Sequence, residues 1–119
     1  MVGGLVRRVA VADDPAERAR GLMEVEDLGD VQGMLFVFPE DSTAGFWMKD
    51  TLIPLDIAFF AADGSPVGLP SAMLPCRTAP ICPTHRPEGP YRFALEVPAG
   101  GFAGLGDLRL DPASVGDGR

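Results

Sequence analysis

The sequence has no long hydrophobic run. No stretch approaches the eighteen or so uninterrupted apolar residues that a membrane-spanning helix needs. The apolar run at the N-terminus stops at Arg7, which is too early for the hydrophobic segment of a signal peptide. We therefore expect no membrane insertion and a cytoplasmic protein as the sequence stands, or a periplasmic or extracellular one if a leader has been removed.

Basic residues are also scarce. Ten Lys and Arg stand against seventeen Asp and Glu, for a formal net charge of −7. Proteins that bind nucleic acid without sequence preference, or anionic membrane surfaces, rely on an excess of Lys and Arg. We therefore expect no nucleic-acid partner.

Two cysteines and one histidine leave little for thiol or metal chemistry. Two cysteines are too few for a disulfide scaffold. Cys76, Cys82 and His85 could supply three zinc ligands, but their spacing is unlike the usual C-x2-C zinc knuckle. The alternatives are a loop disulfide, if the protein is exported, and inert thiols. We expect no metal site and no cofactor.

The local signatures of common enzymes are missing too. The sequence contains no G-x-S-x-G, P-loop, H-E-x-x-H or G-x-G-x-x-G motif. The absence of these motifs argues against an enzyme but does not exclude one, so the question of catalysis stays open.

Glycine and proline, in contrast, are plentiful, with fifteen and twelve residues. This composition favours short strands joined by turns over long helices. A chain of 119 residues fits one domain. We expect it to span residues 1–110, with a flexible C-terminal tail at residues 111–119.

The sequence predicts one short helix in the N-terminal part of the chain. Asp14 is placed to cap it, Pro15 suits its first position and Glu17 can complete a capping box. The helix should end near Arg20, with Gly21 as its C-cap.

Alternating or continuous apolar residues predict strands at several places. A buried strand should be stopped by Pro39, and Asp63 with Gly64 signals a hairpin. Residues 68–90 contain many prolines and are expected to form a long irregular loop. The expected strands cover residues 5–12, 33–38, 46–49, 55–59 and 91–97, with a short edge strand at 108–110.

The stretch at residues 46–57 combines Trp47, Lys49, Asp50 and Asp56 with apolar neighbours. Buried or half-buried charges are costly unless they are paired. In an extended strand Lys49 and Asp50 point to opposite sides. The charges form either structural ion pairs and turn caps, or a polar pocket with Trp47 at its base.

Arg20 offers a planar guanidinium at the end of the expected helix, suited to a carboxylate or a phosphate. Its partner is either a ligand anion or a structural acceptor such as Glu96, Asp56 or a carbonyl at the helix end. In the last long strand, Glu96 points away from Phe93 and Leu95. The candidate binding residues are Arg20, Trp47, Lys49, Asp50, Asp56 and Glu96.

Several short motifs, in order, resemble the bacterial and archaeal family called domain of unknown function 192. The resemblance spans roughly residues 5–110 and implies a compact, mainly β domain, of barrel or sandwich-like form, with one short N-terminal helix. It implies no reaction, cofactor or ligand. The motifs are Arg20-Gly21-Leu22-Met23, Gly33-Met34-Leu35-Phe36, Phe46-Trp47-Met48-Lys49-Asp50-Thr51, Pro54-Leu55-Asp56-Ile57, Leu95-Glu96 with Gly100, and Gly106-Asp107.

The chain departs from the family pattern in three places. Asp50 stands where the family usually has Asn, residues 68–70 weaken a strand, and residues 101–107 look shortened. The leading hypothesis is a non-catalytic domain that binds a small ligand, peptide or protein partner in a polar cleft near Trp47 and Lys49. The alternatives are a hydrolase that uses carboxylates and Lys49, and purely structural roles for the motif residues.

Overall fold

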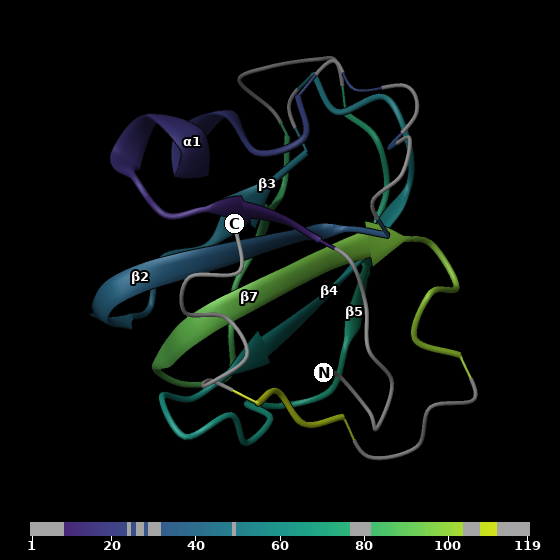
Figure 1. Ribbon diagram of the computed structural model, residues 1–119. Helices are drawn as coiled ribbons and strands as arrows, with labels where there is room; N and C mark the ends of the chain where they lie inside the picture. Colours follow the sequence, from purple (N-terminus) through teal and green to yellow (C-terminus); the bar gives the residue numbers. More distant parts are fainter. Residues whose placement is uncertain are drawn as a thin grey trace.

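A computed structural model describes residues 9–23, 25, 28, 32–48, 50–76, 82–103 and 108–111. Within these residues lie one helix, α1 (Pro15–Arg20), and seven strands. Figure 1 shows their arrangement. The strands are β1 (Ala10–Ala12), β2 (Met34–Ser42), β3 (Phe46–Trp47), β4 (Leu55–Phe60), β5 (Ser71–Met73), β6 (Thr84–His85) and β7 (Tyr91–Pro98). In the part of the chain that the structure describes, no helix has the length and hydrophobicity to span a bilayer.

Five strands form one open sheet in the order β1-β2-β7-β4-β5. The last strand in the chain, β7, lies at its centre and pairs antiparallel with both β2 and β4 (Figure 1). The edge strand β1 pairs parallel with β2, so the connection between them, which contains α1, crosses over the sheet. Strands β3 and β6 form a separate antiparallel pair.

Both faces of the five-stranded sheet are covered, because its strands alternate their side chains between two apolar clusters. One cluster includes Phe60, Leu95 and Val97, together with Phe102 from the chain after β7. The other includes Phe36, and Phe46 of β3 packs against it. The mainly β prediction is therefore confirmed in its sandwich-like form, and the sheet is not closed into a barrel.

The predicted helix is confirmed with its caps. The backbone N–H of Glu17 donates to Oδ1 of Asp14 at 2.7 Å, and Gly21 ends the helix with a φ of 51°. The Glu17 carboxylate accepts from the N–H of Asp13 at 3.1 Å, one residue before the position of a standard capping box. Local side-chain chemistry thus fixes the start and the end of α1.

The prediction that Pro39 stops the buried strand is wrong, because β2 continues to Ser42. The register of β2 against β7 shifts between Val37 and Ser42. The N–H that Pro39 lacks is not needed in that stretch, since no ladder pair falls on it, so the strand passes through the proline.

Two strands, β5 and β6, lie inside the region expected to be an irregular loop, so that expectation is wrong in part. Strand β5 pairs with β4 and β6 pairs with β3. The hairpin at Asp63 and Gly64 is confirmed, because Ala61 and Ser65 are joined by a backbone hydrogen bond of 2.8 Å. Residues 77–81 lie outside the described part.

The remaining predicted strands differ at their ends. The strand predicted at residues 5–12 is described only from Val9 onward. The strand predicted at residues 46–49 begins at Phe46 but contains just two residues. No strand forms at residues 108–110. Leu108 and Leu110 are buried in the core instead, and the N–H of Leu110 donates to the carbonyl of Gly64. Most of the predicted tail, residues 112–119, lies outside the described residues.

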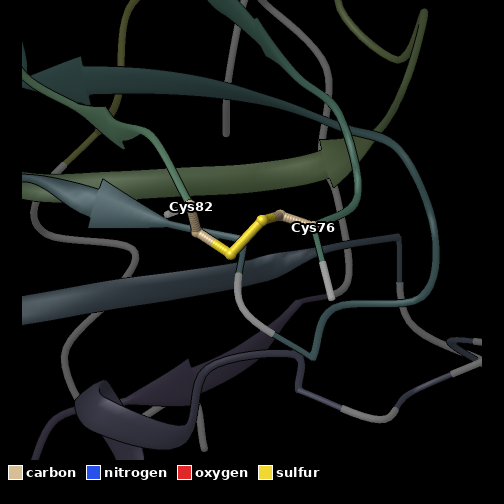
Figure 2. Close-up of a disulfide and its surroundings, with 2 residues drawn as sticks. All are labelled: Cys76 and Cys82. Atoms are coloured by element: carbon tan, nitrogen blue, oxygen red, sulfur yellow. A yellow bond between two sulfur atoms is a disulfide. The ribbon is translucent and has the colours of Figure 1, made fainter. Parts of the chain in front are cut away.

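Cys76 and Cys82 form a disulfide that ties the segment after β5 to the segment before β6 (Figure 2). The carbonyl of Cys76 accepts from the N–H of Asp50 at 3.0 Å, and its N–H donates to the carbonyl of Met48. These two backbone hydrogen bonds of Cys76 join the end of the segment after β5 to the turn that follows β3. Both sulfurs are bonded to each other, so neither is a thiolate available to zinc.

Candidate functional site

A cleft of about 250 Å³ lies between α1, the face of β2, and β3. Among the residues that the structure describes, the lining includes aromatic rings, two arginines and one carboxylic acid. Arginines come from α1, aromatic rings from β2, β3 and β7, and the acid, Glu96, from β7. Because a crossover connection carries α1 back over the sheet, side chains from distant parts of the sequence meet here.

Glu96 projects from the central strand of the sheet. It lies opposite Met34 of β2 and Ile57 of β4, and only 4% of its surface is exposed. Burial raises the pKa of its carboxyl group to about 8. No described residue donates a hydrogen bond to this carboxyl group or forms an ion pair with it. At pH 7 the free protein therefore keeps Glu96 largely as the neutral acid, which can both donate and accept a hydrogen bond.

The two arginines of α1 differ in their contacts. Arg18 donates from Nη1 to the carbonyl of Val37 at 3.0 Å, and its guanidinium lies 5.1 Å from the ring centre of Phe38. Both contacts hold Arg18 against β2. Arg20 is exposed at the cleft and forms no ion pair with any carboxylate that the structure describes. Its five N–H donors are therefore available to a ligand.

Phe46 is the centre of the aromatic wall. Its ring lies 5.0 Å from that of Phe36, 5.8 Å from that of Phe59 and 6.2 Å from that of Tyr91. Tyr91 donates its hydroxyl hydrogen to the carbonyl of Ala44 at 2.8 Å, which fixes the loop before β3. The Phe36–Phe46 pair packs edge to face and the other two pairs are tilted, and rings in contact on several sides leave the wall little freedom to rearrange.

Three of the six residues predicted for the site line the cleft: Arg20, Trp47 and Glu96. Trp47 is 43% exposed. Glu96 was one of the alternatives for the partner of Arg20, and no ion pair joins these two side chains. Lys49 lies outside the described residues.

Asp56 does not line the cleft. It neighbours Ile57 in β4 and therefore points to the other face of the sheet, away from Glu96. Its Oδ2 accepts a hydrogen bond from the N–H of Gly100 at 2.9 Å, which fastens the turn after β7. This contact gives Asp56 a structural role in the turn after β7.

Asp50 is also absent from the cleft and belongs to the turn after β3. Its φ of 56° lies in the left-handed region, where Asn and Asp are the best tolerated residues after glycine. The departure from Asn to Asp at this position thus preserves the backbone requirement.

Sequence reasoning missed Arg18 and most of the aromatic wall. The run of apolar residues in β2 predicted burial, but it gave no indication that Phe36 and Phe38 would face a cleft. Arg18 stands two residues before Arg20 at the end of the same helix, and that pairing was the available signal.

A group of exposed carboxylates at Asp13, Asp14 and Glu17 is close enough to meet at a metal ion. Two of these carboxylates already accept hydrogen bonds from the backbone at the start of α1. Their arrangement is therefore accounted for by helix capping.

Comparison with known proteins identifies a matching family and similar solved structures. The family model of domain of unknown function 192, described as "Uncharacterized ACR", matches residues 2–107. No curated protein matches the chain significantly. Two solved structures are similar, each 33% identical in sequence.

The first of these structures is a protein of unknown function from Novosphingobium aromaticivorans, with a TM-score of 0.72; the match covers 83% of this chain and 70% of the other. The second, from Sinorhizobium meliloti, is described as a "putative transcription regulator", with a TM-score of 0.76 over 88% of this chain and 81% of the other. The motifs, the fold and the family match agree. The chain belongs to the domain of unknown function 192 family.

Proposed function

We propose that this protein is a binding domain that holds a small organic ligand in the cleft between α1, β2 and β3, without catalysing a reaction. The observation that carries the proposal is Glu96, a buried carboxyl group that opens into the cleft and has no partner among the described residues. Burying such a group costs stability, and a bound ligand would offset part of that cost. The volume of the cleft suits a small molecule better than a folded partner.

The test is a thermal-shift screen of amino acids, carboxylates, amines, sugars, nucleotides and short peptides. A ligand at ten times its Kd adds about 1.4 kcal/mol to stability, which raises the Tm of a domain of this size by a few degrees. Ala19 lines the cleft from α1, so Ala19→Phe should fill it and abolish the shift.

The matched control is Ala16→Phe, an exposed position on the same helix that does not line the cleft. It should keep the wild-type response. A ligand that stabilises wild type and Ala19→Phe equally binds elsewhere, and a screen without any hit removes the support for the proposal.

A hydrolase is the second candidate, because one observation favours it. A carboxyl group in a cleft with a pKa near the working pH is what a general acid or base needs. Neither Asp50 nor Asp56 reaches the cleft, so Glu96 would act without a second carboxylate among the described residues. Turnover of nitrophenyl esters or glycosides by wild type, lost in Glu96→Gln, would favour this candidate.

We propose no role in binding nucleic acid, although the similar protein from Sinorhizobium meliloti is described as a "putative transcription regulator". The formal net charge of this chain is −7, and phosphate binding needs an excess of basic residues. A fluorescent DNA duplex should show no binding at 150 mM salt.

A further inference from the structure

The cleft has a basic group on one wall and an acidic group on another. Arg20 brings a guanidinium from α1, and Glu96 brings a carboxyl group from β7. The two side chains do not form an ion pair, and burial alone accounts for the raised pKa of Glu96. A ligand in the cleft could therefore pair with the guanidinium of Arg20 and with the carboxyl group of Glu96.

Aromatic side chains share the cleft with these two groups. Phe36, Phe46 and Trp47 line the same cleft. A ligand with a charged group at each end and an apolar body would satisfy the two polar groups and cover the rings. Ligands with one charge would leave either the guanidinium or the buried carboxyl group unpaired.

Building on the proposed function, we propose that the ligand is a small amine-bearing carboxylate with an apolar body, whose carboxylate pairs with Arg20 and whose ammonium group pairs with Glu96. The cleft volume of about 250 Å³ can hold a molecule of about the size of an amino acid. An ammonium group can donate to the Glu96 carboxylate, and a carboxylate can accept two parallel hydrogen bonds from a guanidinium.

Proton release distinguishes this ligand from a simple anion. An ammonium group that pairs with Glu96 needs the ionised carboxylate, so binding near pH 7 drives the proton of the neutral acid into solvent. An anion bound beside Glu96 would favour the neutral acid, and no proton would be released. The described groups of the cleft wall that carry charge or can titrate, other than Glu96, are Arg18, Arg20 and Tyr91. Burial raises the pKa of Tyr91 from its ordinary value of 10.0.

The experiment compares matched probes. 4-(Aminomethyl)benzoate carries both charges, 4-methylbenzylamine carries the ammonium alone, and 4-methylbenzoate carries the carboxylate alone. Phenylalanine and 6-aminohexanoate test shorter and longer charge separations. Binding is followed by the fluorescence of Trp47, the single tryptophan of the chain, and by calorimetry at pH 7 in two buffers of different ionisation enthalpy.

The expected result has three parts. At least one probe with both charges binds ten-fold or more tightly than either singly charged probe, as one charge-assisted contact is worth roughly ten-fold. Glu96→Gln weakens the doubly charged and the amine probes, whereas Arg20→Met weakens the doubly charged and the carboxylate probes. Wild type releases most of one proton on binding, and Glu96→Gln releases none.

The matched controls are Glu40→Gln and Arg109→Met, both at exposed positions outside the cleft, and they should bind every probe as wild type does. Singly charged probes that bind within three-fold of the doubly charged ones, or binding without proton release, would overturn the ligand class. If the probes fail while the broader screen finds a ligand that Ala19→Phe excludes, this class is wrong and the proposed function stands. If neither finds a ligand, both fail.

Discussion

The buried carboxyl group of Glu96 makes a quantitative prediction about stability. Its pKa is about 8 in the folded protein and 4.5 in a model compound, so between these pH values the folded state holds a proton that the unfolded chain has lost. The stability of the wild type should therefore fall as the pH rises through this window and stay level above it. Each pH unit costs about 1.4 kcal/mol, so roughly 3 kcal/mol is lost between pH 5 and pH 7.

Glu96→Gln isolates this effect, since glutamine keeps the shape of the neutral acid and does not ionise. The variant should exceed wild type only slightly at pH 5, which lies just inside the window, and by roughly 3 kcal/mol at pH 7. The assay is urea unfolding at both pH values, under non-reducing conditions so that the disulfide stays intact.

Glu40→Gln serves as the control, because it makes the same substitution at an exposed position on β2. This control should differ from wild type by less than about 0.5 kcal/mol at either pH. If the difference between wild type and Glu96→Gln is the same at pH 5 and pH 7, the carboxyl group is either solvated or paired, and the reasoning about the cleft fails with it.

Three further predictions concern stability. Replacing Cys76 and Cys82 together by serine should cost about 2 kcal/mol in urea unfolding, because a disulfide across so short a loop restricts the unfolded chain only modestly; an unchanged midpoint would contradict this. Asp56→Ala should lose about 1 kcal/mol with the hydrogen bond to Gly100, whereas Asp56→Asn keeps an acceptor and should lose less; equal losses would show that the bond is unimportant. Gly33→Ala would place a methyl group against a backbone carbonyl of β7, so its Tm should drop by several degrees, and an unchanged Tm would show that the backbone yields there.

The features of the fold that the sequence predicted are the local ones. Asp14, Pro15 and Gly21 act within a few residues of themselves, and the helix begins and ends where they indicate. The alternation of side chains along β4 likewise explains why Asp56 lies on the face opposite Leu55 and Ile57. Capping and alternation depend on the chain's nearest neighbours, so a single sequence contains them.

The grouping of side chains in the cleft depends on contacts between distant residues. Arg20 and Glu96 line the same cleft because the crossover connection that contains α1 passes over the face of β2 and β7. No local pattern in the sequence specifies this arrangement. Asp50 and Asp56 are close to Trp47 in sequence, but a turn and the pleat of β4 direct them elsewhere. Pro39 shows the same limit, since its tolerance depends on the register of a partner strand.

The position of β7 has a consequence for how the chain folds. The strand at the centre of the sheet comes from residues 91–98, after every other strand in sequence order. Without it, β1 with β2 and β4 with β5 remain two separate strand pairs, each with an exposed edge. Contacts across such long sequence separations slow folding, because the intervening loops must close first. During synthesis the sheet can therefore assemble only after about four fifths of the chain has been made, and Glu96 reaches the cleft in the same step that joins the two halves.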